Sequence, residues 1–222
     1  MHRPWFRIVA LVVMGLMATA GLQARGKKPP KNKKPPSFDY YMLVLSYAPD
    51  FCAQPAGDKD PRECGAGRQV GFVVHGLWPQ GETTRGPENC GPAGSIPDNT
   101  IQEMLHYFPT EALMQHEWKA HGTCSGLSAG DYFAAVKKAR DSVKVPDELT
   151  PSSRQSMTPA DVEAKVAIAN PDFPKSAFRS SCYPDKELQE IRICLNKDLS
   201  PRACGSSAGE CSAKEVTLLP VR

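Results

Sequence analysis

Residues 116–124 read His-Glu-Trp-Lys-Ala-His-Gly-Thr-Cys, and the expected fold depends on this stretch. It ends a run of helix-forming residues and places two histidines and a carboxylate within six positions. A second block, His-Gly-Leu-Trp-Pro at residues 75–79, supplies a third imidazole. Three imidazoles and a carboxylate without an obvious nucleophile indicate proton transfer at a phosphate.

The spacing in the first block argues against a zinc-protease site. Such a site needs two histidines four residues apart on one helical face. His116 and His121 are five residues apart, which separates them by about 140° around a helix. Glu117 and His121 are the pair four residues apart, so they share a face. We therefore expect Glu117 to orient His121 and raise its basicity, and we expect no metal and no cofactor.

The N-terminal residues are typical of an export signal. Two arginines precede an uncharged apolar run at 8–20, and small residues follow it. The sequence predicts a signal peptide over 1–24, with cleavage after Ala20 or Ala24. The alternative is an uncleaved anchor, although a membrane helix needs roughly 20 apolar residues. After cleavage we expect no membrane span and a periplasmic or secreted protein.

The cysteines indicate the same compartment. All eight lie beyond the signal and none forms a Cys-x-x-Cys pair, a pattern that favours disulfides over a zinc site. They are Cys52, Cys64, Cys90, Cys124, Cys182, Cys194, Cys204 and Cys211.

The formal charge of +3 comes from the N-terminal end of the 222-residue chain. Residues 1–36 hold eight of the 27 Lys and Arg and no acid, which leaves 19 cations against 24 acids in the remainder. A body of this charge argues against tight nucleic-acid binding by bulk charge and favours transient binding at a local site.

Residues 25–36 read RGKKPPKNKKPP. Such a basic, proline-rich segment cannot bury a core, so it is predicted to be a disordered linker. Its alternative role is a weak electrostatic tether to RNA or to an anionic envelope surface. Residues 37–222 are long enough for one domain with its own core, and we expect a monomer.

Hydrophobic patterns predict an α+β domain. Strands are expected over 40–47, 69–74, 187–195 and 215–219, the second of them delivering His75 at its end. Helices are expected over 100–107, from Thr110 to Gly122, over 129–143 and over 159–169, with a long loop over 81–97. Helices and strands that do not alternate regularly are typical of the α+β class.

The two blocks resemble the ribonuclease T2 family of secreted or vacuolar endoribonucleases. Residues 75–79 match its first motif, and residues 116–124 match its second. The resemblance covers nearly the whole mature chain, and it implies an antiparallel β-sheet flanked by helices. It also implies a metal-independent enzyme that cleaves single-stranded RNA. The ribose 2′-hydroxyl would attack the phosphorus, giving a 2′,3′-cyclic phosphate and then a 3′-phosphate.

The resemblance also implies roles for individual residues. His121 would be the general base and His75 the general acid, while His116 and Glu117 would hold and polarise the phosphate. Trp78 is a candidate for stacking on a base, with core packing as the equal alternative. Gln80 is a candidate for hydrogen bonding to a base edge, with an exposed loop amide as the default.

A cysteine pairing is implied in the same way. The pairs are Cys90–Cys124, Cys182–Cys211 and Cys194–Cys204, with Cys52–Cys64 remaining.

One position departs from the family pattern. The lysine that normally precedes the last histidine of the second motif is replaced by Ala120, and Lys119 lies on the far side of a regular helix. One phosphate contact is therefore in question. The alternative functions are a catalytically weak RNA-binding or toxin-like member of the same fold, and a secreted disulfide-rich binding protein with structural histidines.

Overall fold

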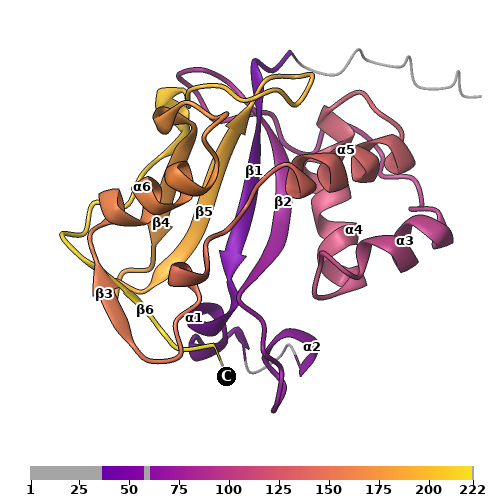
Figure 1. Cartoon of the computed structure of the whole chain (residues 1–222). Helices are drawn as coiled ribbons and strands as arrows, with labels where there is room; N and C mark the ends of the chain where they lie inside the picture. The colour runs from indigo at the N-terminus through magenta and orange to yellow at the C-terminus, as the bar shows by residue number, and fades with distance from the viewer. Residues whose placement is uncertain (1–36, 58–60, 222) are drawn as a thin grey trace, which may run out of the picture. The chain divides into compact units, whose positions relative to one another are not determined.

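The computed structural model describes residues 37–57 and 61–221 (Figure 1). The predicted signal peptide and linker lie outside these residues. In the part that is described, no helix is long and apolar enough to cross a membrane.

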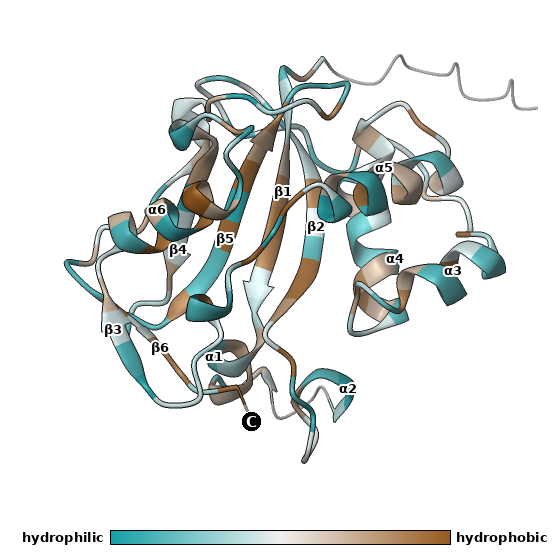
Figure 2. Cartoon of the chain, viewed as in Figure 1, coloured by the Kyte–Doolittle hydropathy of each residue, from teal (hydrophilic) through white to brown (hydrophobic). Residues whose placement is uncertain are grey.

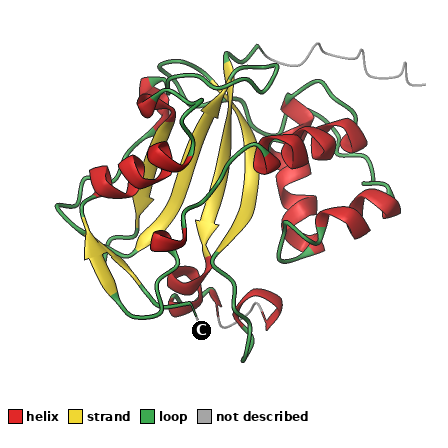
Figure 3. Ribbon diagram, viewed as in Figure 1, coloured by secondary structure: helices red, strands yellow, loops and turns green. Residues whose placement is uncertain are grey.

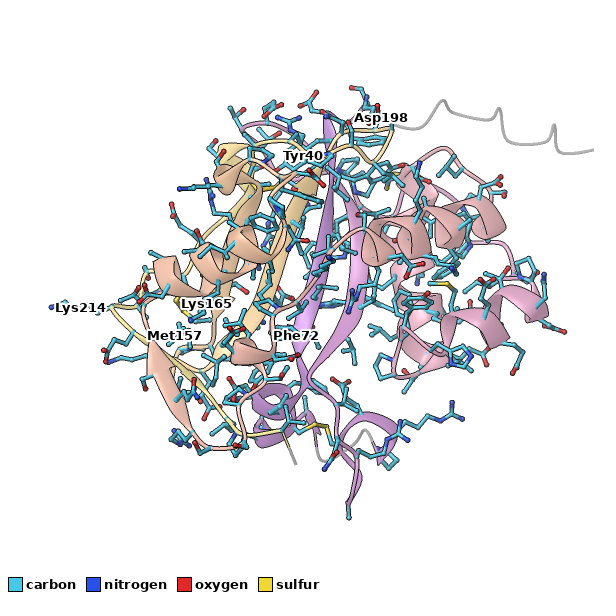
Figure 4. The ribbon with its side chains drawn as sticks, in the orientation of Figure 1. Tyr40, Phe72, Met157, Lys165, Asp198 and Lys214 are labelled. Atoms are coloured by element: carbon cyan, nitrogen blue, oxygen red, sulfur yellow. A yellow bond between two sulfur atoms is a disulfide. The ribbon has the colours of Figure 1, made fainter. Side chains whose placement is uncertain are left out.

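An antiparallel sheet forms the centre of the domain (Figure 1). Its order within the described residues is β2–β1–β5–β4, with β1 at Tyr40–Tyr47, β2 at Phe72–Gln80, β5 at Leu188–Leu195 and β4 at Phe178–Cys182. Figure 4 labels Tyr40 and Phe72 toward opposite ends of the β1–β2 pair, where they lie opposite Gln80 and Tyr47. The α+β prediction is confirmed, as are the strands expected over 40–47 and 187–195.

The two faces of β1 pack differently because successive side chains point to opposite sides of a strand. Leu43 and Leu45 belong to the main core, together with Leu77 and Ile193 from the neighbouring strands. The even-numbered face carries a smaller apolar cluster around Met42. Figure 2 shows β1 as a largely hydrophobic strand at the centre of the sheet.

Helices flank the sheet, as expected (Figure 3). The longer ones are α3 at Asp98–Met104, α4 at Glu111–Ala120, α5 at Ala129–Asp141 and α6 at Pro159–Ala169. Short helices α1 at Ala48–Ala53 and α2 at Pro61–Cys64 follow β1, and a small separate sheet pairs β3 at Gln155–Met157 with β6 at Val216–Leu218.

The predicted helix starts at Thr110 and Thr158 are confirmed. The Thr110 hydroxyl accepts a hydrogen bond from the Leu113 amide at 3.1 Å. Thr158 forms a capping box with Asp161: the Thr158 hydroxyl accepts a hydrogen bond from the Asp161 amide, and the Asp161 carboxylate accepts one from the Thr158 amide. These caps fix where α4 and α6 begin.

Several predicted boundaries were wrong, among them the end of the helix expected to reach Gly122, which lies at Ala120. The strand expected over 69–74 runs instead from Phe72 to Gln80, so His75 lies within it. Pro79 is accommodated because β2 is an edge strand, where a missing amide hydrogen costs no ladder bond on the open side. The helix expected over 100–107 begins at Asp98 after Pro97 and ends at Met104.

The eight cysteines, all within the described residues, are joined in the pairs that the resemblance implies. The disulfides are Cys52–Cys64, Cys90–Cys124, Cys182–Cys211 and Cys194–Cys204. Cys90–Cys124 ties the loop after β2 to the turn after α4, which brings the two sequence blocks into one region.

Candidate active site

The face of the sheet opposite the main core carries the polar site. Trp78 on β2 lies opposite Met42 on β1, and Arg192 on β5 lies opposite Val44. Paired residues on neighbouring strands share a face. Trp78, Arg192 and Glu190, two positions before Arg192, therefore all lie on this second face.

His75 occupies an irregularity in the strand. Val44 pairs with Gly76, but the next residue, Leu45, pairs with Val74, so His75 has no partner on β1. An extra residue of this kind forms a β-bulge, which re-aims side chains and is frequent beside active sites. The bulge places the imidazole on the same face as the indole of Trp78, with ring centroids 5.1 Å apart.

Helix α4 contributes the carboxylate of Glu117, which has no exposed surface. The indole nitrogen of Trp78 donates a hydrogen bond to Glu117 Oε2 at 2.7 Å. Glu117 Oε1 lies 3.6 Å from His75 Nε2. Gly76 is required here because a Cβ at that position would collide with Glu117 Oε2.

The environment of Glu117 favours its protonated form. Burial raises the pKa of Glu117 to about 7, although the charge of His75 and the hydrogen bond from Trp78 act in the opposite direction. Oε1 has no hydrogen-bond partner among the described residues. A buried oxygen without a partner costs free energy, so this atom is available to a substrate group.

His75 is held between two acids. Its Nδ1 lies 2.9 Å from Glu190 Oε1, and its side chain is 31% exposed. Burial disfavours the cation, but the hydrogen bond to Glu190 and the charges of Glu117 and Glu190 outweigh it, so the pKa of His75 is raised. His75 is therefore disposed to carry a proton.

Sequence reasoning missed Glu190, Arg192 and Ser181. Glu190 is 2% exposed, and its Oε2 accepts hydrogen bonds from Arg192 and from the Ser181 hydroxyl. The sequence shows Glu190 and Arg192 on one side of a strand that alternates with Ile191 and Ile193 on the other, a pattern that is ordinary for an antiparallel strand with one solvated face and therefore did not mark a site.

His121 lies just beyond α4 as its C-terminal cap, with φ −119°, and the helix ends at Ala120. Its ring stacks on Trp78 with centroids 5.0 Å apart and planes 27° from parallel. Burial and the charges of His75 and His116 lower the pKa of His121 to about 4.

The prediction that Glu117 raises the basicity of His121 was therefore wrong. Glu117 Oε2 is bonded to the Trp78 indole, and Oε1 has no hydrogen-bond partner. The carboxylate faces His75, so His121 is left in an environment governed by burial.

The remaining residues of the second block lie at different depths. His116 is exposed on α4, close enough for its charge to act on His121. Lys119 is also exposed, as the helical phase predicts. Ala120 is 8% exposed, and its carbonyl accepts a hydrogen bond from the Asn89 amide at 2.8 Å.

Trp118 packs in the main core with 6% exposure. Its indole nitrogen donates to the Gly94 carbonyl at 2.9 Å, which fixes part of the loop over 81–97. A Cβ at Gly122 would collide with the Trp118 ring. The motif glycine and tryptophan are thus required by packing.

A pocket of about 350 Å³ opens beside Trp78 and His121. Gln80 also lines this pocket. It is only 7% exposed, and its Oε1 accepts a hydrogen bond from the Gly86 amide at 3.2 Å. The default reading of Gln80 as an exposed loop amide was therefore wrong. The other lining residues include Arg85, Glu88, Arg192, Ser207 and Gly209.

Among the residues that the structure describes, no three His, Cys, Asp or Glu side chains are arranged to hold a metal ion. The groups that converge are suited to transferring protons and to binding an anion.

Comparisons with known proteins agree with this geometry. Residues 38–204 match the Ribonuclease T2 family. The chain is 35% identical to a ribonuclease of Aeromonas hydrophila over 93% of this chain and 89% of that protein. It is 32% identical to a probable ribonuclease of Haemophilus influenzae over 79% of this chain and 64% of that protein, so it spans less than two thirds of this relative.

A solved structure shares the fold. The S-like ribonuclease trichomaglin superimposes with a TM-score of 0.66 at 22% identity, covering 84% of this chain and all of that one. With the matched residues spanning both histidine blocks, the chain belongs to the Ribonuclease T2 family and is an endoribonuclease.

Proposed function

We propose that this enzyme cleaves single-stranded RNA with His121 as the general base and His75 as the general acid. The observation that carries the proposal is that two imidazoles contact one indole ring, that of Trp78, in environments that shift their pKa values in opposite directions. The pKa of His121 is lowered to about 4 and that of His75 is raised. Near neutral pH, one ring can accept a proton while the other can donate one.

In the first step, His121 takes the proton of the ribose 2′-hydroxyl as that oxygen attacks the phosphorus. The bond from phosphorus to the 5′-oxygen breaks, and His75 gives its proton to the departing oxygen. The products are a 2′,3′-cyclic phosphate and a 5′-hydroxyl. In the second step the two histidines exchange roles: His75 takes a proton from water as its oxygen attacks the phosphorus, the bond from phosphorus to the 2′-oxygen breaks, and His121 returns a proton to that oxygen, which leaves a 3′-phosphate.

Glu117 and His116 are proposed to hold the phosphate. An ionised carboxylate would repel it, but a pKa of about 7 leaves much of Glu117 protonated at neutral pH. A proton on the unpartnered Oε1 can donate a hydrogen bond to a phosphoryl oxygen. His116 is exposed near His121, where its ring can donate a hydrogen bond to the same phosphate.

The pocket beside Trp78 is proposed to receive a base. The Trp78 ring lines it, and Gln80 presents its amide there. The ring stacks on His121 and its nitrogen is bonded to Glu117. Trp78 therefore supports the catalytic groups as well as offering a surface for base stacking.

Digestion of a defined oligoribonucleotide in excess EDTA tests the reaction. We expect cyclic-phosphate products that convert to 3′-phosphates, and no cleavage of the matching DNA, which lacks the 2′-hydroxyl. Loss of cleavage in EDTA with recovery on adding zinc or magnesium would overturn the metal-independent mechanism. Single turnover with RNA in excess would instead support the alternative of a catalytically weak RNA-binding member.

The domain organisation and location are also proposals. A signal peptide over 1–24, a basic linker over 25–36 and a ribonuclease domain over 37–222 would give a periplasmic or secreted monomer. The four disulfides need an oxidising compartment, and a relative from tomato is named an extracellular ribonuclease. N-terminal sequencing of protein recovered from the periplasm or medium, with its mass measured in solution, tests these points.

A further inference from the structure

Glu190 is a buried carboxylate on a central strand with no solvent beside it. It lies on β5 opposite Ser46 of β1 and Ser181 of β4, on the face that carries the site. Only 2% of the residue is exposed. An ion in such a place is costly unless charge and hydrogen bonds compensate it, so its partners indicate its role.

Each oxygen of Glu190 has its own partners. Oε1 lies 2.9 Å from His75 Nδ1. Oε2 accepts hydrogen bonds from Arg192 Nε and Nη2, both at 2.9 Å, and from Ser181 Oγ at 3.2 Å. Arg192 is anchored in turn, because its Nη1 donates to the Ala208 carbonyl at 2.8 Å. Oε2 of Glu190 is thus held by Arg192 and Ser181, and Oε1 is directed at His75.

We infer that Glu190 is the positioning residue of His75: it fixes the tautomer with hydrogen on Nδ1, directs Nε2 toward the substrate, and helps to set the alkaline limit of activity. An ionised carboxylate only accepts hydrogen bonds, so the hydrogen of this pair must lie on Nδ1. Nε2 then faces Glu117, 3.6 Å from Oε1. The inference rests on the proposed role of His75 as the general acid.

The groups around His75 act in different directions. Glu190 and Arg192 face it from β5, Glu117 from α4, and His121 from beyond the end of α4. The two acids favour the imidazolium, whereas Arg192 opposes it.

Glu190 is the acid that stays ionised. Burial disfavours its anion, but the hydrogen bond and charge of His75 and the contacts with Arg192 outweigh burial, so the pKa of Glu190 is lowered. The pKa of Glu117 is raised to about 7, so its negative charge is partly lost at neutral pH. The steady electrostatic support of the His75 cation therefore comes from Glu190.

The test is Glu190→Gln, which keeps the size of the side chain and removes its charge. NMR titration of the His75 ring should show a lower pKa than in the wild type. The alkaline limb of kcat/KM for a dinucleotide should move to lower pH. At pH values above the wild-type plateau, the kcat/KM of the variant should be about tenfold or more below that of the wild type. At acid pH its KM should change little.

Glu163→Gln is the matched control. Glu163 Oε1 accepts hydrogen bonds from the amide and hydroxyl of Ser180 on β4, so the same chemical change is made beside the same sheet without a histidine partner. This variant should lose some stability and leave the pH profile unchanged.

If Glu190→Gln does not fold because Arg192 is left without its anion, the double variant Glu190→Gln/Arg192→Gln is measured instead and compared with Arg192→Gln, so that the two proteins differ only in the charge of Glu190. An unchanged pKa of His75 and an unchanged alkaline limb in the folded variant would overturn the inference. Failure of the proposed function looks different, because His75→Ala would then keep wild-type turnover whatever Glu190 does to the titration of His75.

Discussion

The indole nitrogen of Trp78 donates a hydrogen bond to Oε2 of Glu117 at 2.7 Å, and this bond joins the edge strand β2 to helix α4. The same indole ring contacts His75 edge-on and stacks on His121. Trp78 therefore holds together two imidazoles and a carboxylate, which come from different parts of the chain.

Trp78→Phe keeps an aromatic ring and removes the donor. Glu117 then has no hydrogen bond to either oxygen, so its pKa should rise further. The loss of a hydrogen bond to a buried carboxyl should also cost on the order of 1–3 kcal/mol of unfolding free energy. Thermal denaturation and the pH dependence of kcat/KM measure both effects.

Trp118→Phe is the control, because its indole donates to the Gly94 carbonyl and not to the site. It should lower stability without altering the pH profile. Equal pH profiles for Trp78→Phe and the wild type would show that the hydrogen bond does not tune Glu117.

His75→Ala and His121→Ala should each reduce turnover by about 10²–10⁴-fold, the usual contribution of a general acid or base. Initial rates on a defined oligoribonucleotide measure this. His106→Ala, at an exposed residue outside both motifs, should remain close to wild type. A folded His75 or His121 variant with normal turnover would contradict the assigned roles.

The pH profile of kcat/KM should be bell-shaped. The base must be unprotonated, so the rate should rise as the pH passes the value of about 4 for His121. The acid must be protonated and Glu117 must keep its proton to bind the phosphate, so the rate should fall as the pH rises through the value of about 7 for Glu117 and through the raised pKa of His75. Steady-state rates between pH 3 and 9 test this, and an acid limb near the usual histidine pKa of about 6.5 would contradict it.

Asp50→Asn should stabilise the protein at neutral pH. Asp50 has no exposed surface and accepts a hydrogen bond from the Leu219 amide, and burial raises its pKa to about 7. A folded pKa above the unfolded value of 3.8 means that the native state prefers the protonated acid. Stability from this group is therefore full below pH 3.8 and is lost as the pH rises toward 7.

The variant resembles the protonated acid at every pH. Its advantage over the wild type should be small at pH 4 and reach on the order of 2 kcal/mol above pH 7, measured by chemical denaturation. Asp161→Asn is a control of opposite sign, because its hydrogen bonds with Thr158 lower the pKa of Asp161. Relative to the wild type, Asp161→Asn should lose stability as the pH rises.

Ala120→Lys should raise kcat by about tenfold and change KM less, because an added cation meets its full partner only in the transition state. Ala120 is mostly buried beneath the backbone at Asn89, so the lysine should also lower the melting temperature. Lys119→Ala should have little effect, since that side chain is exposed. If Lys119→Ala greatly reduced kcat while Ala120→Lys left kcat unchanged, Lys119 would already reach the phosphate.

Local signals predicted much of the fold. Thr110 and Thr158 marked helix starts because capping depends on neighbours in the sequence. The apolar run at 40–47 marked a strand buried on both faces. The second strand was misjudged because Gly76 and Pro79 are ordinarily strand breakers, and only their place on an edge strand makes them acceptable.

The sequence could predict which motif residues gather at the candidate site, but not which of them contact each other. The motifs identified His75, His121 and Glu117, yet spacing along α4 assigned Glu117 to the wrong histidine. Which imidazole it meets depends on how β2 lies against α4, which is a tertiary relationship. Glu190 comes from a strand more than 60 residues after the second motif, and no local pattern links it to His75.

The bulge at His75 has a consequence for insertions and deletions in this part of the chain. Val74 and Leu77 both reach the main core although they are three positions apart, a spacing that an uninterrupted strand would send to opposite sides. Removing one residue at position 75 would restore regular pairing and leave both segments of β2 correctly oriented, but without the imidazole. Deleting Leu77 would instead place Trp78 in the register of Leu77 and turn the indole inward, so the length of this motif is constrained separately from its composition.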